Sequence, residues 1–208
     1  KKGTGYRLVE NILKINSFFS SDERQVEVII LSKNNAATSL RITNAINDLK
    51  LDIIRSAWTS GTNISNYLKA FKVDLFLSAD DNDVLNAIEN GVAAAKILHS
   101  NENIHNISNE QVRIAFDGDA VLFSEESELV YKNHGLEAFI EHEKENRNNP
   151  LEMGPFAKLL LTIAKIQAKF PTDKSPIRTA LVTARSAPTH ERVIKTFNLW
   201  GVRVDEAF

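Results

Sequence analysis

The sequence predicts an α/β fold in which helices cover both faces of a parallel sheet. Short apolar runs alternate along the chain with longer segments of helical period. The apolar runs are rich in Val, Ile, Leu and Phe and mostly lack strict alternation with polar residues, which is typical of parallel strands buried on both faces. Strand–helix alternation of this kind gives right-handed crossovers between parallel strands.

The elements follow from these two patterns in chain order. The expected strands are Val26–Leu31, Ile53–Trp58, Val73–Leu77, Val112–Phe116, Arg178–Thr183 and Val202–Asp205. The expected helices are Tyr6–Asn16, Ser39–Leu49, Ile64–Phe71, Asp83–Ile97, Glu126–Glu145, Phe156–Phe170 and Thr189–Trp200. The Asp83 helix carries acidic residues in its first turn, where they favour the positive end of the helix dipole. Apolar residues form one stripe on the Phe156 helix, which predicts a single buried face.

We interpret the chain as two diverged αβ halves, 1–110 and 111–208. At one constant offset Leu8 aligns with Leu159 and Ser32 with Thr183, each within a helix–strand–helix run. A constant offset across three elements favours a duplication, although chance or shared αβ patterning is the alternative. The polar, Asn-rich segment His99–Gln111 is the softest seam between the halves.

The segment 124–175 interrupts the second half between two expected strands. It begins with an acidic run and then contains two of the expected helices. Taken alone, the simpler interpretation is that both helices cover a face of the sheet. The charged run from His142 to Arg147 is interpreted as a solvated face.

Composition excludes several functional classes. The 208 residues include 25 basic and 27 acidic side chains, for a formal charge of −2. With charges so nearly balanced, the chain has no overall positive electrostatic field that would attract nucleic acid or an anionic membrane. No run approaches the ~20 apolar residues of a membrane span. Cysteine is absent, which excludes disulfides, thiol catalysis and zinc–thiolate sites and fits a cytosolic address. The sequence leaves open whether the protein forms a homo-oligomer.

The strongest local signal is Asp117-Gly118-Asp119, at the carboxyl end of an apolar strand. Ligands bind at that edge of an open parallel sheet. Two carboxylates this close repel, so one takes a proton or a divalent cation compensates them. An ionised Asp117 on magnesium can attack phosphorus, and a protonated Asp119 can donate to the leaving oxygen. Gly118 lets a phosphate approach the backbone. A surface Asp-Gly-Asp turn is an equal alternative.

A second signal follows the strand that ends at Thr183. Arg185 and Ser186 enter a loop, and a helix begins near Thr189. A hydroxyl, loop N–H groups and a helix N-terminus together make an oxyanion cradle, and Arg185 could clamp an anionic substrate. Taken alone, the simpler interpretation is that Thr189 caps the helix and Thr183 merely ends a strand.

Together the two signals resemble the haloacid dehalogenase (HAD) superfamily, whose first motif is Asp-x-Asp and whose second is a Thr or Ser after an apolar strand. Longer runs look like the cytosolic 5′-nucleotidase type I family: FDGDAVLFSEESE, GLEAF, PLEMGPF, IRTALVTARSAPTHERVIKT, VEVIILSKN and YLKAFKVDLFLSADDNDV. The resemblance covers nearly the whole chain. It implies a HAD-like Rossmannoid sheet and a cytoplasmic, magnesium-dependent phosphatase acting on nucleoside 5′-monophosphates. HAD proteins insert a cap between these two motifs, so the resemblance also implies that the first helix of 124–175 forms a small helical cap over the site and that Phe156–Phe170 packs on the sheet.

The resemblance also implies residue roles. Asp117 would be the nucleophile that forms an aspartyl phosphate, Asp119 the general acid/base, and Thr183 the group that binds the transferring phosphoryl. The expected Mg²⁺ ligands are the Asp117 carboxylate and the Asp119 main-chain carbonyl. The other candidates for phosphate binding lie beside these positions: Gly118, Ala184 and Arg185.

The sequence also departs from the family pattern. HAD enzymes use a Lys and an acidic pair as well, and in this family both follow the strand at Phe208, where the chain stops. We expect both chain ends to be cut from a longer protein. The alternatives are a catalytically incomplete nucleotide-binding module and a HAD phosphatase for another small phosphate ester. Asp80 and Asp81 are a further candidate metal pair, although capping of the Asp83 helix is the simpler interpretation.

Overall fold

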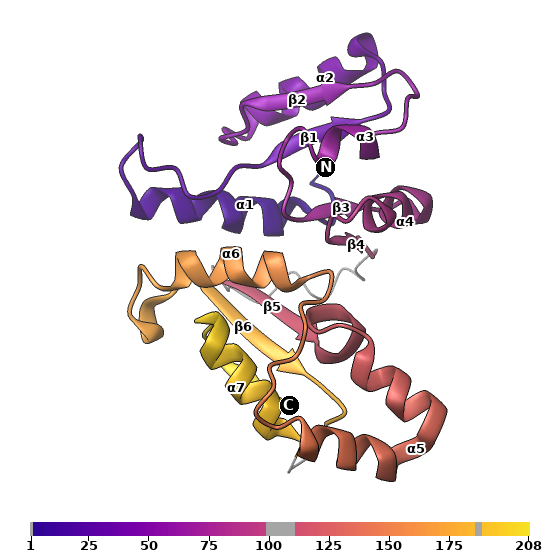
Figure 1. Ribbon diagram of the computed structural model, residues 1–208. Helices are drawn as coiled ribbons and strands as arrows, with labels where there is room; N and C mark the ends of the chain where they lie inside the picture. The colour runs from indigo at the N-terminus through magenta and orange to yellow at the C-terminus, as the bar shows by residue number, and fades with distance from the viewer. Residues whose placement is uncertain (1, 99–110, 186–188) are drawn as a thin grey trace. The chain divides into compact units, whose positions relative to one another are not determined.

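The computed structural model describes residues 2–98, 111–185 and 189–208. The chain divides into two compact units, Lys1–Val112 and Arg113–Phe208 (Figure 1). Most of the expected seam, 99–110, lies outside the described residues. The interpretation of the halves as a diverged repeat stays a prediction. No helix in the described part of the chain has the length and hydrophobicity that a bilayer-spanning segment requires.

The first unit combines short parallel strand pairs with helices. Its elements are α1 (Tyr6–Lys14), the 3₁₀ turn Ile15–Phe18, β1 (Ile29–Ser32), α2 (Ala36–Asp48), β2 (Arg55–Trp58), α3 (Ser65–Leu68), β3 (Phe76–Ser78), α4 (Asp81–Glu89) and β4 (Ala94–Lys96). Strand β1 pairs with β2 and β3 with β4, both in parallel. A core cluster forms where α3, α4 and β3 meet, and it includes Leu68, Phe76 and Ala87.

For one helix of this unit, the predicted second half was wrong. The pattern predicted a helix from Asp83 to Ile97, but α4 ends at Glu89 and the chain returns as β4. Gly91 adopts a left-handed φ of 73°, a conformation that commonly terminates helices. The Asp80 side chain accepts a hydrogen bond from the Asp83 N–H at 3.0 Å, so the expected capping of α4 is confirmed.

The second unit holds a three-stranded sheet with helices beside it. Its elements are β5 (Val112–Asp117), the turn Gly118–Leu122, α5 (Glu126–Glu145), α6 (Ala157–Gln167), the 3₁₀ turn Thr172–Lys174, β6 (Ile177–Val182), α7 (His190–Trp200) and β7 (Glu206–Ala207). The strand order is β5-β6-β7, with β6 and β7 parallel. In Figure 1 the arrows of β5 and β6 run the same way, and α6 and α7 lie on opposite sides of them.

The parallel pairs with flanking helices confirm the predicted α/β class. Strand β6 and helix α7 lie within one residue of their expected bounds. Helix α6 buries the predicted stripe, including Leu159, Leu160 and Ile163. The last strand lies further along than expected, at Glu206–Ala207 instead of Val202–Asp205.

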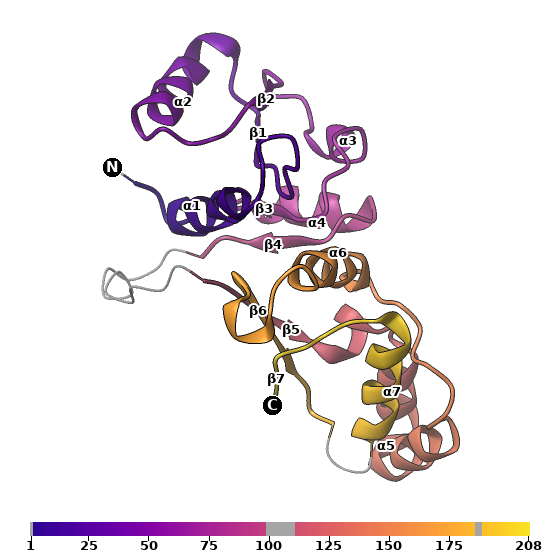
Figure 2. The same cartoon turned by 90° about the vertical axis from the view of Figure 1, so that its left-hand side faces the viewer.

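Helix α5 is a helical hairpin. Gly135 interrupts it with φ 82° and ψ −175°. Because glycine has no Cβ, it adopts a positive φ without a steric clash. The bend brings the two ends of α5 together. The Ser127 hydroxyl donates to Glu143 at 2.6 Å, and the His142 Nε2 lies 3.1 Å from the Glu126 Oε1. Figure 2 shows the same helix folding back beside α7.

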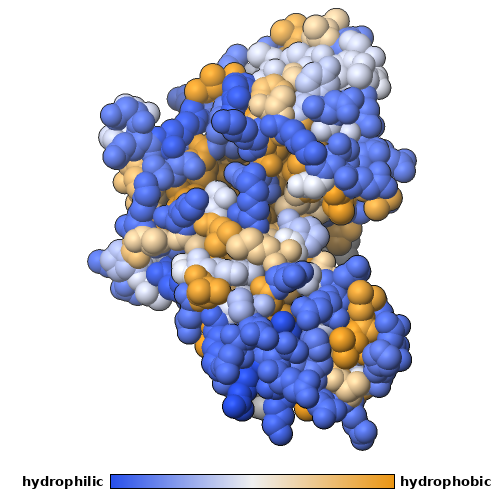
Figure 3. Space-filling view, viewed as in Figure 1, coloured by the Kyte–Doolittle hydropathy of each residue, from blue (hydrophilic) through white to orange (hydrophobic). Residues whose placement is uncertain are grey.

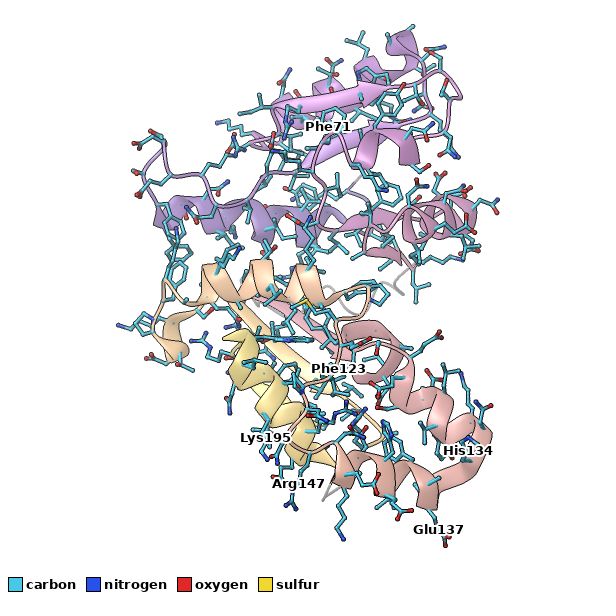
Figure 4. The ribbon with its side chains drawn as sticks, in the orientation of Figure 1. Phe71, Phe123, His134, Glu137, Arg147 and Lys195 are labelled. Atoms are coloured by element: carbon cyan, nitrogen blue, oxygen red, sulfur yellow. The ribbon has the colours of Figure 1, made fainter. Side chains whose placement is uncertain are left out.

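Aromatic side chains fill the space between α7 and the turn after β5. Phe123 is fully buried, and its ring lies 5.6 Å from Phe197 and 5.8 Å from Trp200. Figure 4 places Phe123 inside the unit and His134 and Glu137 at the outer bend of α5. The face of this unit that is turned to the viewer in Figure 3 is mostly hydrophilic, with hydrophobic residues along its right-hand edge.

Candidate active site

Strand β5 delivers Asp117 to the sheet edge. Val112 and Phe116 are buried and anchor the strand, whereas the Asp117 side chain is exposed. Within the described part of the chain, no hydrogen bond or ion pair is found for the Asp117 carboxylate. An unpaired, exposed carboxylate at the end of a buried strand is available to a ligand.

A wide turn follows Asp117 and redirects the chain. The Phe123 N–H donates to the Gly118 carbonyl at 3.0 Å, and Ala120 takes a left-handed φ of 60°. For a residue with a Cβ, that conformation costs about 1–2 kcal/mol. Strained backbone of this kind occurs often at functional sites. The turn carries the Asp119 side chain away from solvent, leaving 22% of it exposed.

Strand β6 brings Thr183 against the same turn. An ideal Cβ built on Gly118 would lie 3.2 Å from the Thr183 Oγ1 and 3.3 Å from the Thr183 Cβ. The glycine therefore allows a close approach between the two loops that a larger residue would oppose. The Arg185 N–H donates to the Thr183 hydroxyl at 3.2 Å, which holds that hydroxyl at the start of the loop. The two sequence motifs thus lie side by side.

Arg185 connects this loop to Asp119. Its guanidinium donates from Nε to both Asp119 oxygens, at 3.1 and 3.0 Å, and from Nη2 to Oδ1 at 2.5 Å. The Arg185 side chain is 1% exposed. Its planar fork suits carboxylate geometry, and paired hydrogen bonds of this kind fix the orientation of both groups. Phosphate binding by Arg185 stays a prediction, as do the roles of Gly118 and Ala184.

The remaining guanidinium nitrogen of Arg185 donates to Glu143 of α5. Glu143 has a fully buried side chain and also accepts from Arg192 of α7 at 2.9 Å. When Asp119 is ionised, Asp119 and Glu143 place two acidic charges against the two basic charges of Arg185 and Arg192. The buried part of this cluster is therefore electrically balanced, which offsets the cost of removing the charges from water.

The electrostatic surroundings keep Arg185 charged. Burial of its side chain lowers its pKa, but the hydrogen bonds that it donates to Asp119 and the charges of Asp119 and Glu143 more than compensate. The pKa of Arg185 consequently lies above its ordinary value. Its guanidinium also lies 5.9 Å from the Phe123 ring and 5.4 Å from the Phe139 ring, and both contacts favour a cation.

Sequence reasoning missed Glu143 and Arg192. The run from His142 to Arg147 was interpreted as a solvated face, which is wrong for Glu143, 2% exposed. The available signal was Gly135, because a glycine inside a helical pattern can end or bend the helix. Without that bend, the position of Glu143 opposite Ser127 is not expected.

Other candidates lie outside this cluster or outside the described residues. Ser186 belongs to 186–188, which the structure does not describe. Thr189 holds the N-cap position of α7, but its side chain makes no capping hydrogen bond. In the first unit, Asp80 caps α4 and Asp81 pairs with Lys96 at 2.8 Å.

The described residues hold no group of three or more His, Cys, Asp or Glu that could bind a metal ion. The oxygens expected as ligands, the Asp117 carboxylate and the Asp119 carbonyl, are nevertheless hard donors. Mg²⁺ usually keeps several waters and takes only one or two protein carboxylates besides substrate phosphates. The exposed Asp117 carboxylate, which has no protein partner in the described residues, fits that requirement.

Comparison with known proteins gives a consistent result. A 5′-nucleotidase family model matches residues 1–208. Human cytosolic 5′-nucleotidase 1B is 35% identical over 214 residues, which cover 99% of this chain and 35% of the relative. This chain thus spans about a third of the length of that relative. No solved structure matches the chain. With the full-length match to the family model, the chain belongs to the 5′-nucleotidase family.

Proposed function

We propose that this protein is a magnesium-dependent phosphatase that hydrolyses nucleoside 5′-monophosphates to a nucleoside and phosphate. Membership of the 5′-nucleotidase family supports the reaction and the nucleotide substrate. The observation that carries the assignment to this site is the close approach of Gly118 to Thr183. It brings a free carboxylate and a hydroxyl-bearing loop to one edge of the sheet, as phosphoryl transfer requires. We also propose a cytosolic location, since the human relative is named cytosolic.

In the first step, an Asp117 oxygen attacks phosphorus in line with the ester bond. The bond between that oxygen and phosphorus forms while the bond from phosphorus to the ribose 5′ oxygen breaks. Asp119 acts in this step in its protonated form, and gives that proton to the departing 5′ oxygen as general acid. The product is an aspartyl phosphate on Asp117 and a free nucleoside.

In the second step, water attacks the phosphorus of the aspartyl phosphate. Asp119 accepts a proton from that water as general base, and the bond between Asp117 and phosphorus breaks. Thr183 and neighbouring N–H groups hold the phosphoryl oxygens in both steps. Mg²⁺, held by the Asp117 carboxylate and the Asp119 carbonyl, would supply charge neutralisation at the phosphoryl group.

The test is phosphate release from adenosine 5′-monophosphate by the full-length protein with Mg²⁺. We expect turnover that EDTA abolishes and excess Mg²⁺ restores. Asp117→Asn should lower kcat by at least about a thousandfold, because the nucleophile is lost, while the unfolding temperature stays near that of the wild type. A panel of sugar and aryl phosphates separates a nucleotidase from a broader phosphatase. Binding of the nucleotide without phosphate release would instead favour a nucleotide-binding module.

A further inference from the structure

Glu143 is the most completely buried carboxylate of the second unit that the proposed reaction does not use. Its side chain is 0% exposed. It accepts hydrogen bonds from the Ser127 hydroxyl at 2.6 Å, from Arg192 at 2.9 Å and from Arg185. A buried carboxylate is costly unless it is paired and hydrogen-bonded, and here each oxygen has a partner. Glu143 is therefore held in one orientation by groups from three separate segments.

Arg185 transmits that orientation to Asp119. One edge of its guanidinium meets Glu143 through Nη1, and the other meets Asp119 through Nε and Nη2. Because the guanidinium is rigid and planar, fixing one edge fixes the plane that the other presents. The Arg185 side chain is 1% exposed, so water does not compete for these bonds.

We propose that Glu143 is a positioning residue, which acts through Arg185 to hold the Asp119 carboxylate in the geometry needed for proton transfer to the leaving group. This inference rests on the proposed function and deepens it. Small displacements of a catalytic group have large effects on rate. If Glu143 has this role, the α5 hairpin supports the active site, and so do Ser127 and Arg192, which hold Glu143 in place.

A purely structural role for Glu143 makes a different prediction. If the cluster only anchors α5, its loss should slow every substrate alike or slow none. If it positions the general acid, the loss should depend on how much the leaving group needs a proton. A nucleoside 5′-monophosphate expels a strongly basic alkoxide. Its 5′-thio analogue, with sulfur as the bridging atom, expels a thiolate that needs no proton. Both share the same base, sugar and phosphoryl group.

The experiment compares single-turnover cleavage of these two substrates by wild-type protein, Glu143→Gln and the control Glu137→Gln. Glu137 lies on the same hairpin but at its exposed bend (Figure 4). For Glu143→Gln we expect the oxygen ester to be cleaved about 30- to 100-fold more slowly and the sulfur ester less than about threefold more slowly. Glu137→Gln should match the wild type with both.

Arg185→Lys provides a second variant that keeps the buried charge. A single ammonium cannot present two hydrogen-bonding edges to two carboxylates, so the same selective loss is expected even where Glu143→Gln folds poorly. Equal slowing of both esters in either folded variant, or no slowing in either, would overturn the inference while leaving the proposed function intact. A wild-type protein that cleaves neither ester would overturn both.

Discussion

Replacing Gly118 by Ala probes the contact on which the candidate site depends. The new Cβ would lie 3.2 Å from the Thr183 Oγ1, 3.3 Å from the Thr183 Cβ and 3.6 Å from the Leu181 Cδ1. The last distance is an ordinary contact, but the first two are tighter than side chains normally allow. Gly118 is not among the glycines with positive φ. The backbone therefore accepts alanine, and the whole perturbation falls on Thr183.

The magnitude follows from how far Thr183 must move. A shift of a few tenths of an ångström relieves the contact, so the loss of stability should be about 1–2 kcal/mol, as for mild overpacking. The effect on catalysis should be larger. A misplacement near 1 Å can cost about 100-fold in rate, so we expect about a 10- to 50-fold lower kcat for a nucleoside 5′-monophosphate.

The assay combines initial rates of phosphate release with thermal unfolding of the same preparations. Gly3→Ala is the matched control, because a Cβ at Gly3 meets nothing within 4 Å. It should leave both measurements near the wild-type values. A wild-type kcat in Gly118→Ala would contradict a catalytic role for this contact, since the hydroxyl of Thr183 would then not need its observed place beside Gly118.

Two further predictions concern stability. Gly154→Ala should cost about 3 kcal/mol or more in urea unfolding, at the upper end for overpacking, because its Cβ would lie 2.3 Å from the Phe123 main-chain oxygen; a loss below about 1 kcal/mol would contradict this packing. Arg55 hydrogen-bonds Glu27 and holds the pKa of that carboxyl below its ordinary value of 4.5. The pair therefore stabilises the fold above pH 4.5 and loses its effect as the pH falls through the lower, folded-state pKa. Glu27→Gln should cost under about 1 kcal/mol at pH 7, since the pair is partly exposed, and the difference should shrink as the pH is lowered below 4.5; a difference that does not change with pH would argue against the ion pair.

Much of the fold was predictable because periodicity reports local burial. Strand β5 and helix α6 follow directly from apolar runs and stripes. The failure at β4 has a physical cause. The run Val92–Lys96 is rich in Ala, which favours helix locally, and only tertiary pairing with β3 makes Ala94–Lys96 a strand. The left-handed Gly91 was the local signal that marked the change.

Only those residues of the candidate site that lie at the ends of strands could be predicted from the sequence. Asp117 and Thr183 stand at the ends of apolar strands, and the topology of a parallel sheet brings such ends to one edge. Glu143 reaches the cluster through a bend at Gly135 and a contact with Arg185 that is 42 residues distant in sequence. Helical periodicity describes one straight segment, so it carries no information on which face a bent helix folds against.

The proposed reaction requires that Asp117 becomes covalently phosphorylated during turnover. The most direct measurement is intact-protein and peptide mass spectrometry after acid quenching of the full-length protein with a nucleoside 5′-monophosphate and Mg²⁺. We expect one added phosphoryl group on the peptide that contains Asp117 and no added mass in Asp117→Asn. Phosphate release without that adduct, or an adduct that persists in Asp117→Asn, would contradict it.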